Sequence, residues 1–179
     1  MEQIVQQSLH NLVQRLRAEQ HNSEDRFTVE YDSDWPSVCY LSEAATGDQV
    51  KWQPVAMDTP LSFANIENAL HITLNEQYCH FFTTNWSFNL LTQASEGPCE
   101  LLQVCNQEDF ERLQQNLIGH LMMKQRLKQP PTLFFGLTDE EDFILSVDNA
   151  SGEVVLEQVG KHPVRCLAPD LATFLDGLR

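Results

Sequence analysis

The spacing of apolar residues predicts a long amphipathic helix that begins after Asn106. Apolar side chains recur there every three or four positions, as on the buried face of a helix: Phe110, Leu113, Leu117 and Leu121. Asn106 is a typical N-cap, and Asp109 three residues later completes a box-like cap. Pro130 and Pro131 end the helix, because neither has a backbone N–H to donate.

Three short segments with the composition of β-strands follow this helix, and turn residues separate them. The apolar run 132–137 leads into a turn at 138–142 that holds four consecutive carboxylates. The segment 143–147 precedes a second turn, DNASG at 148–152, and a third strand-like segment at 153–159. We therefore expect the helix to pack on an antiparallel meander whose first turn is strongly acidic.

The chain before this helix contains weaker patterns, which predict two helices and several strands. Residues 3–19 place apolar side chains on one helical face, and Ser62 is expected to cap a short helix at 63–70. The aromatic and β-branched composition of YCHFFTT favours a strand at 78–84. Further strands are expected in four segments: 27–31, 38–41, 50–55 and 101–104.

Residues 85–98 fit either an extension of a strand or a helical turn, and residues 20–26 are interpreted as a polar loop. Near the C-terminus, Pro169 fits the first position of a short helix that ends near Leu178. Together these patterns predict an α+β fold, with helices packed on a largely antiparallel sheet. The length suits one domain over residues 1–179.

The formal net charge of −15 is the strongest signal in the composition. The charge is unevenly distributed, with sixteen acidic residues against two basic ones between Glu19 and Glu111. A negative field repels nucleic acid and anionic lipid head groups, and it attracts basic partners. The sequence therefore favours a protein that binds a basic partner and no nucleic acid. An acidic surface that only confers solubility is the alternative.

The sequence contains no motif for a metal site, a phosphate-binding loop or nucleophilic catalysis. It has no C-x-x-C, H-x-x-x-H or H-E-x-x-H pattern, and its five cysteines are dispersed, as is typical of reduced core thiols. His80 and His120 are candidate general bases, but both fit structural roles. In a strand, moreover, Cys79 and His80 would point to opposite faces. We therefore expect no cofactor, no metal and no enzymatic activity.

The chain also lacks the patterns that direct a protein into or across a membrane. No apolar run approaches the roughly 20 residues that a membrane-spanning helix needs. The N-terminal segment MEQIVQQSLHNLVQRLRAE has no basic region followed by an apolar one, as a signal peptide would. We therefore expect a cytoplasmic protein.

A series of short motifs runs through the central stretch of the chain. They are Asp109-Phe110, NLIGHL at 116–121, Lys128, PPTLF at 130–134, Ser146-Val147 and SGEV at 151–154. In this order they resemble the Syd family, the SecY-interacting proteins of bacteria. Weaker matches lie on either side: WQP at 52–54, NIE at 65–67, FTT at 82–84 and the segment 167–178. The resemblance covers nearly the whole chain.

This resemblance implies one α/β domain of a superfamily that includes toxin-neutralising immunity proteins. It implies a peripheral protein on the cytoplasmic side of the inner membrane, held there by SecY, the channel subunit of the protein translocase, and not by lipid. Such a protein modulates or checks the translocase through a concave acidic groove for basic SecY loops, without enzymatic activity. The charge agrees, because cytoplasmic loops of membrane proteins are rich in Lys and Arg.

Two other functions stay open at this point. An immunity-type protein would neutralise a soluble toxin instead of binding SecY. A hydrolase would use a carboxylate pair, or a histidine beside Cys79, Cys99 or Cys105, within a deep pocket. A shallow acidic trough would favour a binding protein over a hydrolase.

Seven acidic residues are the candidates for binding the basic partner: Glu67, Glu108, Asp109, Glu140, Glu141, Asp142 and Glu153. Glu67 and Asp109 lie in segments that resemble the family. Helix capping is the alternative role at 108–109, and simple solvation is the alternative for the acidic turn. Asp148 takes no role from the resemblance, and Gly119 is expected to allow close packing of the helix.

Overall fold

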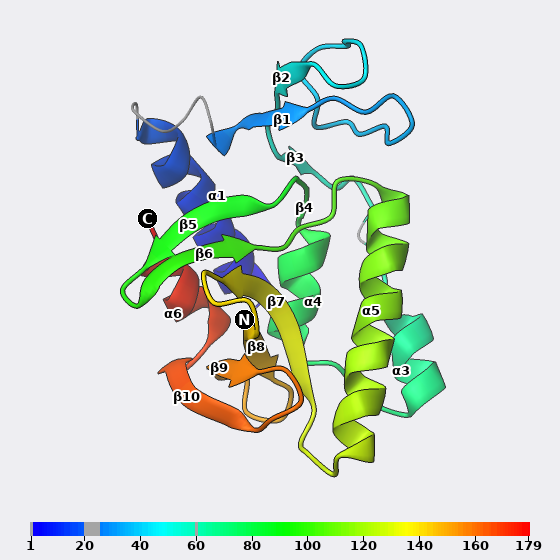
Figure 1. The fold of residues 1–179 in the computed structure, drawn as a ribbon, viewed down its shortest axis with the longest axis vertical. Helices are drawn as coiled ribbons and strands as arrows, with labels where there is room; N and C mark the ends of the chain where they lie inside the picture. Colours follow the sequence, from blue (N-terminus) through cyan, green and yellow to red (C-terminus); the bar gives the residue numbers. More distant parts are fainter. Residues whose placement is uncertain (1, 20–25, 60) are drawn as a thin grey trace.

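The computed structural model describes residues 2–19, 26–59 and 61–179. At its centre is a six-stranded antiparallel sheet with the order β10-β9-β8-β7-β6-β5 (Figure 1). The strands are β5 (Leu90–Ala94), β6 (Gly97–Leu101), β7 (Thr132–Thr138), β8 (Phe143–Asp148), β9 (Val154–Gln158) and β10 (Pro163–Ala168). The expected α+β fold is confirmed, and so is the meander of β7, β8 and β9. Of the expected polar loop 20–26, only Arg26 lies within the described residues.

Helices cover both faces of this sheet. Phe135 of β7 contacts Phe81 and Phe174, whereas its neighbour Phe134 contacts His120. Because consecutive strand residues point to opposite faces, α4 and α6 lie on one face and α5 on the other. The helix α1 packs on α4 and α6, and α3 packs beside α5. The helices are α1 (Glu2–Ala18), α3 (Ala64–Leu70), α4 (Glu76–Thr83), α5 (Gln107–Arg126) and α6 (Leu171–Asp176).

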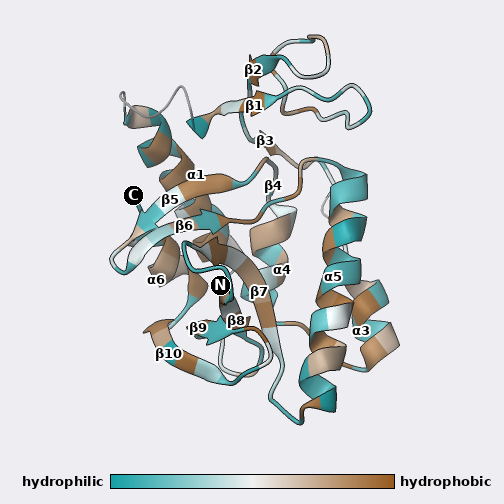
Figure 2. Cartoon of the chain, in the orientation of Figure 1, coloured by the Kyte–Doolittle hydropathy of each residue, from teal (hydrophilic) through white to brown (hydrophobic). Residues whose placement is uncertain are grey.

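The long helix expected after Asn106 is confirmed as α5. The Asn106 side chain accepts a hydrogen bond from the Asp109 N–H at 2.8 Å. The Asp109 carboxylate accepts one from the Cys105 N–H at 3.0 Å, one residue before the cap. Figure 2 shows both teal and brown residues along α5, as its amphipathic pattern requires. The expected packing role of Gly119 is wrong, since, apart from the nearby backbone of α5 itself, no atom lies within 4 Å of the position that a Cβ would occupy.

The strand expected at 78–84 is wrong, because this segment forms the helix α4. Asn75 caps the helix by accepting a hydrogen bond from the Gln77 N–H at 3.1 Å. Tyr78, Phe81 and Phe82 then follow at helical spacing, and all three are fully buried. Burial of this aromatic face outweighs the strand propensity of the residue types. Cys79 and His80 therefore lie on a helix, and the expectation that they point to opposite faces of a strand does not apply.

The smaller strands differ from expectation in length and partner. The expected strand 50–55 is interrupted at Pro54, which has no N–H for a β-ladder. On one side β2 pairs with β1, and on the other β3 pairs with β4. The expected strand 38–41 contains only an isolated bridge from Tyr40 to Trp52. The bounds are β1 (Thr28–Glu30), β2 (Gln49–Lys51), β3 (Val55–Ala56) and β4 (Asn85–Trp86).

Side-chain hydrogen bonds explain two further differences. The expected strand 101–104 ends at Leu101, because the Gln103 N–H bonds to the Asn89 side chain at 3.0 Å instead of to a strand. Pro169 is not in the C-terminal helix, which begins at Leu171 after the N-cap Asp170, whose carboxylate accepts from the Thr173 N–H at 2.7 Å.

In α3 the N-cap position belongs to Phe63 instead of Ser62. The Ser62 hydroxyl still accepts from the Ala64 N–H at 3.1 Å, so it satisfies one helix donor from just outside the cap. The C-terminal strand β10 was not anticipated from the sequence, and its pairing with β9 is irregular at two places.

A buried ion pair joins α5 to the sheet. Lys124 Nζ lies 2.6 Å from Glu157 Oε1 of β9, and both side chains have 1% exposure or less. The ammonium also donates hydrogen bonds to the Gln129 side chain at 3.0 Å and the Lys161 carbonyl at 2.9 Å. Its contact with Glu157 is a short charge–charge contact that is buried on both sides. Nearby, His120 Nε2 lies 2.9 Å from the Thr132 hydroxyl.

Removing one partner of this pair should destabilise the protein strongly. We expect Lys124→Met to lower the free energy of unfolding by about 3–5 kcal/mol, because it leaves the Glu157 charge buried without compensation. The double variant Lys124→Met/Glu157→Leu should recover most of that loss. Urea unfolding measures both, and the exposed Arg126→Met serves as a control with an expected change within about 0.5 kcal/mol. A double variant no more stable than Lys124→Met would contradict the role of the charge.

His120 should make stability depend on pH. Burial lowers the pKa of His120, although the nearby Glu157 carboxylate acts in the opposite direction. The contribution of His120 to the free energy of unfolding is therefore complete above its unfolded-state pKa of about 6.5. This contribution is lost as the pH falls toward the folded-state pKa.

We expect the free energy of unfolding to decline as the pH falls below about 7, and to decline less steeply in His120→Gln. Urea unfolding at a series of pH values measures this slope. His10→Gln, at an exposed position of α1, is the matched control. Equal slopes for the wild type and His120→Gln would show that another group dominates.

Candidate functional site

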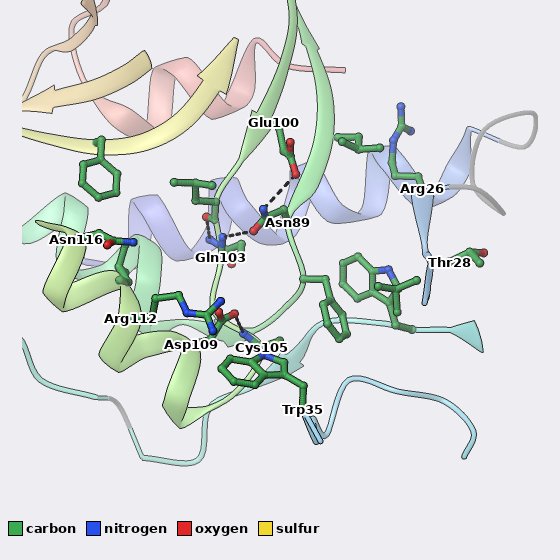
Figure 3. Close-up of a pocket in the computed structure, with 17 residues that line it drawn as sticks. Arg26, Thr28, Trp35, Asn89, Glu100, Gln103, Cys105, Asp109, Arg112 and Asn116 are labelled. Carbon is green, nitrogen blue, oxygen red and sulfur yellow. Dashed lines mark hydrogen bonds between the residues drawn. The ribbon is translucent and has the colours of Figure 1, made fainter. Parts of the chain in front are cut away.

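A cavity of about 500 Å³ lies between the β5–β6 side of the sheet, α5 and the segment around β1 (Figure 3). Its floor includes Glu100 of β6, and its walls include Asp109, Arg112 and Asn116 of α5. These three α5 residues follow at intervals of three and four, so they share one face of the helix. The cavity therefore depends on the angle at which α5 lies on the sheet.

Hydrogen bonds hold the polar side chains of the floor in place. The Asn89 amide donates to Glu100 Oε1 at 3.1 Å and accepts from the Gln103 N–H at 3.0 Å. The Gln103 side chain in turn donates to the Phe81 carbonyl at 3.3 Å. The Glu100 carboxylate is thus oriented by a short amide network and keeps capacity to accept further hydrogen bonds.

Aromatic side chains form the opposite part of the cavity. Trp52 and Phe88 pack edge to face with ring centroids 5.3 Å apart. The Arg112 guanidinium lies 4.6 Å from the centre of the Trp35 ring, a cation–π contact. Flat aromatic surface next to carboxylates suits a cationic side chain, above all the planar guanidinium of arginine.

The charge within the cavity is balanced and not uniformly acidic. Glu100 and Asp109 line it together with Arg26 and Arg112. Arg26 donates a hydrogen bond to the Leu16 carbonyl at 3.4 Å and forms an ion pair with Glu19 at 3.2 Å. Asp109 is partly committed to the Cys105 N–H. The acidic groove expected from the resemblance stays a prediction for this surface.

Two of the thiols proposed as nucleophiles, Cys105 in the cavity and Cys79 in α4, are poorly suited to nucleophilic catalysis. Burial raises the pKa of Cys105 to about 12, and the Asp109 carboxylate adds to the shift. Burial also raises the pKa of Cys79 to about 12, with the Glu67 and Glu76 charges acting in the same direction. The thiolate is the nucleophilic form, so neither group is activated near neutral pH. Among the described residues, no group of three His, Cys, Asp or Glu side chains could hold a metal ion.

The structure brings few of the expected partner-binding acids together. Asp109 lines the cavity, and Glu108 is exposed beside it in the first turn of α5. Glu67 is half-buried, and its carboxylate accepts from the Leu74 N–H at 3.0 Å, which is a structural role. Asp148 likewise serves its own turn by accepting from the Ala150 N–H at 3.0 Å.

The other candidates do not line this cavity. Glu140, Glu141 and Asp142 are exposed in the turn between β7 and β8. Glu153 is exposed just before β9. The seven candidates therefore belong to several separate places, of which only the start of α5 adjoins the cavity.

Several lining residues were missed from the sequence. Arg112 and Asn116 share a helical face with Asp109, so the periodicity of α5 could have identified them. Trp35 lies in a segment far along the chain from the one that holds Glu100 and Gln103. No local pattern connects these segments, and only the fold places them side by side.

Comparison with known proteins gives the same family over most of the chain. The family described as Syd protein (SUKH-2) matches residues 6–179. A protein named Syd from Alteromonas mediterranea is 57% identical over 159 residues, covering 89% of this chain and 88% of the relative. One from Pseudoalteromonas atlantica is 45% identical over 178 residues, covering 98% and 96%. One from Colwellia psychrerythraea is 48% identical over 160 residues, covering 84% and 80%.

Within the described residues, every helix is too short or too polar to cross a membrane.

The reactivity of the thiols tests the conclusion that Cys105 and Cys79 are not activated as nucleophiles. Cys166 is exposed, whereas Cys39, Cys99 and Cys105 are buried and Cys79 is half-buried. With an aromatic disulfide reagent near neutral pH, we expect Cys166 to react first and the others to react mainly after denaturation. Cys166→Ser should remove the fast phase. Rapid labelling of Cys105 or Cys79 in the native protein would revive the nucleophile hypothesis.

Proposed function

Because this chain belongs to the Syd family, we propose that it binds SecY of the protein translocase through basic cytoplasmic loops and modulates or checks the complex. The cavity beside α5 is the surface that best suits such a loop. Glu100 and Asp109 line this cavity together with the aromatic rings of Trp35, Trp52 and Phe88. The protein as a whole has a net charge of −15. This combination of oriented carboxylates and aromatic surface is the observation that supports the proposal.

The global charge and the cavity contribute in different ways. The net charge speeds encounter with a positive surface, because a long-range field steers association. The two carboxylates then receive Lys or Arg side chains of the loop. The two arginines limit how many cations can enter, since like charges in proximity repel. The loop that fits is therefore basic but carries an acceptor, such as a carbonyl or carboxylate, opposite Arg112.

The same electrostatics bear on where in the cell the protein is held. The cytoplasmic leaflet is negatively charged, so a strongly acidic protein is repelled from lipid and needs a protein receptor there. We propose that the chain works as one binding domain, cytoplasmic and peripheral at the inner membrane, and held by SecY instead of lipid. Neutralisation of a soluble toxin is the competing function, and the capture experiment below separates the two.

Capture of detergent-solubilised SecY complex by the purified protein tests this proposal. We expect capture at about 0.05 M salt that weakens strongly by about 0.5 M, because the Debye length shortens severalfold. Glu100→Gln/Asp109→Asn should weaken capture about tenfold, equivalent to about 1.4 kcal/mol, while keeping the acceptors for Asn89 and Cys105.

The matched control is Glu43→Gln/Asp176→Asn, which removes the same charge from exposed positions outside the cavity. Equal losses in both double variants would mean that net charge alone drives binding. Salt-independent capture would overturn the electrostatic account. No capture at low salt would overturn the SecY assignment and favour the toxin-binding function.

A further inference from the structure

A second cavity, of about 220 Å³, lies where the β5–β6 hairpin meets the acidic turn between β7 and β8. Its walls are mainly apolar and come from all six strands of the central sheet and from the segments that adjoin them. The apolar residues include Cys99, Phe143, Leu145, Leu156 and Leu167. Three carboxylates stand at its rim, those of Glu96, Asp139 and Glu140.

This cavity lies on the opposite face of the sheet from the cavity beside α5. Glu100 lines the cavity beside α5, whereas its neighbour Cys99 lines the second cavity. Consecutive residues of a strand point to opposite faces, so β6 separates the two cavities. A ligand in the first cavity therefore leaves the second one accessible.

The acidic rim is held in place before any partner arrives. The Thr138 hydroxyl lies 2.9 Å from the Phe143 carbonyl and accepts from the Glu140 N–H at 3.2 Å. The Phe143 N–H in turn donates to the Glu140 carbonyl at 3.0 Å. Asp139 lies against the β5–β6 hairpin, where a Cβ on Gly97 would be 3.8 Å from its carboxylate. Binding here would order little additional backbone, which favours affinity.

The rim also has unused negative charge. Arg165 pairs with Glu96 at 2.7 Å, so one guanidinium of the chain already occupies part of the rim. In the part of the chain that the structure describes, no Lys or Arg side chain pairs with Asp139 or Glu140. An apolar depression beside two such carboxylates is complementary to a segment that carries both an apolar side chain and a cation.

We propose that this second cavity docks a partner segment in which one large apolar side chain is flanked by Lys or Arg. The volume suits that anchor, since a cavity of about 150 Å³ is known to hold benzene. The apolar side chain would lie against Leu156 and Leu167, and the flanking cations would lie against Asp139 and Glu140. An adjoining cavity of about 150 Å³, which shares Ala94 and Leu167, continues toward α6 and gives the segment its direction. This site acts independently of what binds beside α5.

Titration of the full-length protein with short capped peptides, followed by methyl NMR, tests this proposal. The probe is Gly-Lys-Phe-Lys-Gly, and the comparison peptides carry Glu-Phe-Glu or Lys-Ser-Lys at the centre. We expect the probe to shift the methyl signals of Leu156 and Leu167 in a saturable way at millimolar concentration. Both comparison peptides should bind at least tenfold more weakly, because each lacks one half of the recognition.

Asp139 and Glu140 are exposed, so their substitution should leave the fold intact. Asp139→Asn/Glu140→Gln should weaken probe binding at least threefold and reduce its salt dependence. The matched control, Glu43→Gln/Asp176→Asn, should leave it unchanged. Ala94→Phe, which fills the junction of the two adjoining cavities, should weaken the probe at least tenfold while distant methyl signals stay in place.

Four results would overturn the proposal. They are absence of saturable shifts, shifts confined to the cavity beside α5, equal binding of the Lys-Ser-Lys peptide, and unchanged binding in Asp139→Asn/Glu140→Gln. None of them bears on capture of SecY through Glu100 and Asp109, so failure here is distinguishable from failure of the proposed function.

Discussion

The buried contact between Lys124 and Glu157 determines how α5 lies on the sheet. Both charges are out of reach of water, and either one left unpaired would be very costly. The helix therefore cannot slide or rotate on the sheet without breaking the pair. The pair restrains the C-terminal end of α5, and the buried Phe110 and Leu113 hold the other end, where Asp109 and Arg112 reach the cavity. The pair thus contributes positional specificity more than net stability.

The alternation of side chains across the sheet then divides the molecule into two surfaces. On one face the strands bury apolar residues against α4 and α6, and on the other they meet α5. Neither set of helices covers the whole sheet, and a cavity remains on each face beside β6. One strand thus supplies Glu100 to a polar, aromatic site and Cys99 to an apolar one. Two cavities of different chemistry therefore adjoin a single strand, because its side chains alternate between the two faces of the sheet.

Sequence patterns predicted the parts of the fold that local rules decide. The α5 helix has a cap, a regular apolar stripe and a proline stop, and the meander after it has clear turn residues. The segment 78–84 failed because its composition favours a strand while the Asn75 cap and aromatic burial stabilise a helix. For the site, Asp109 was found because it lies in a strong motif. Glu100 and Trp35 could not be found, since only tertiary packing brings them together.

The total charge of the chain does not by itself define where a partner binds. With a net charge of −15, acidic side chains occur on many surfaces, and several of them serve the fold. Glu67 accepts a backbone hydrogen bond, Asp148 stabilises a turn and Asp109 caps a helix. Two arginines even line the cavity that best suits a basic loop. In the binding that we propose, long-range charge governs encounter, whereas the few carboxylates held beside aromatic or apolar surface determine which basic segment stays bound.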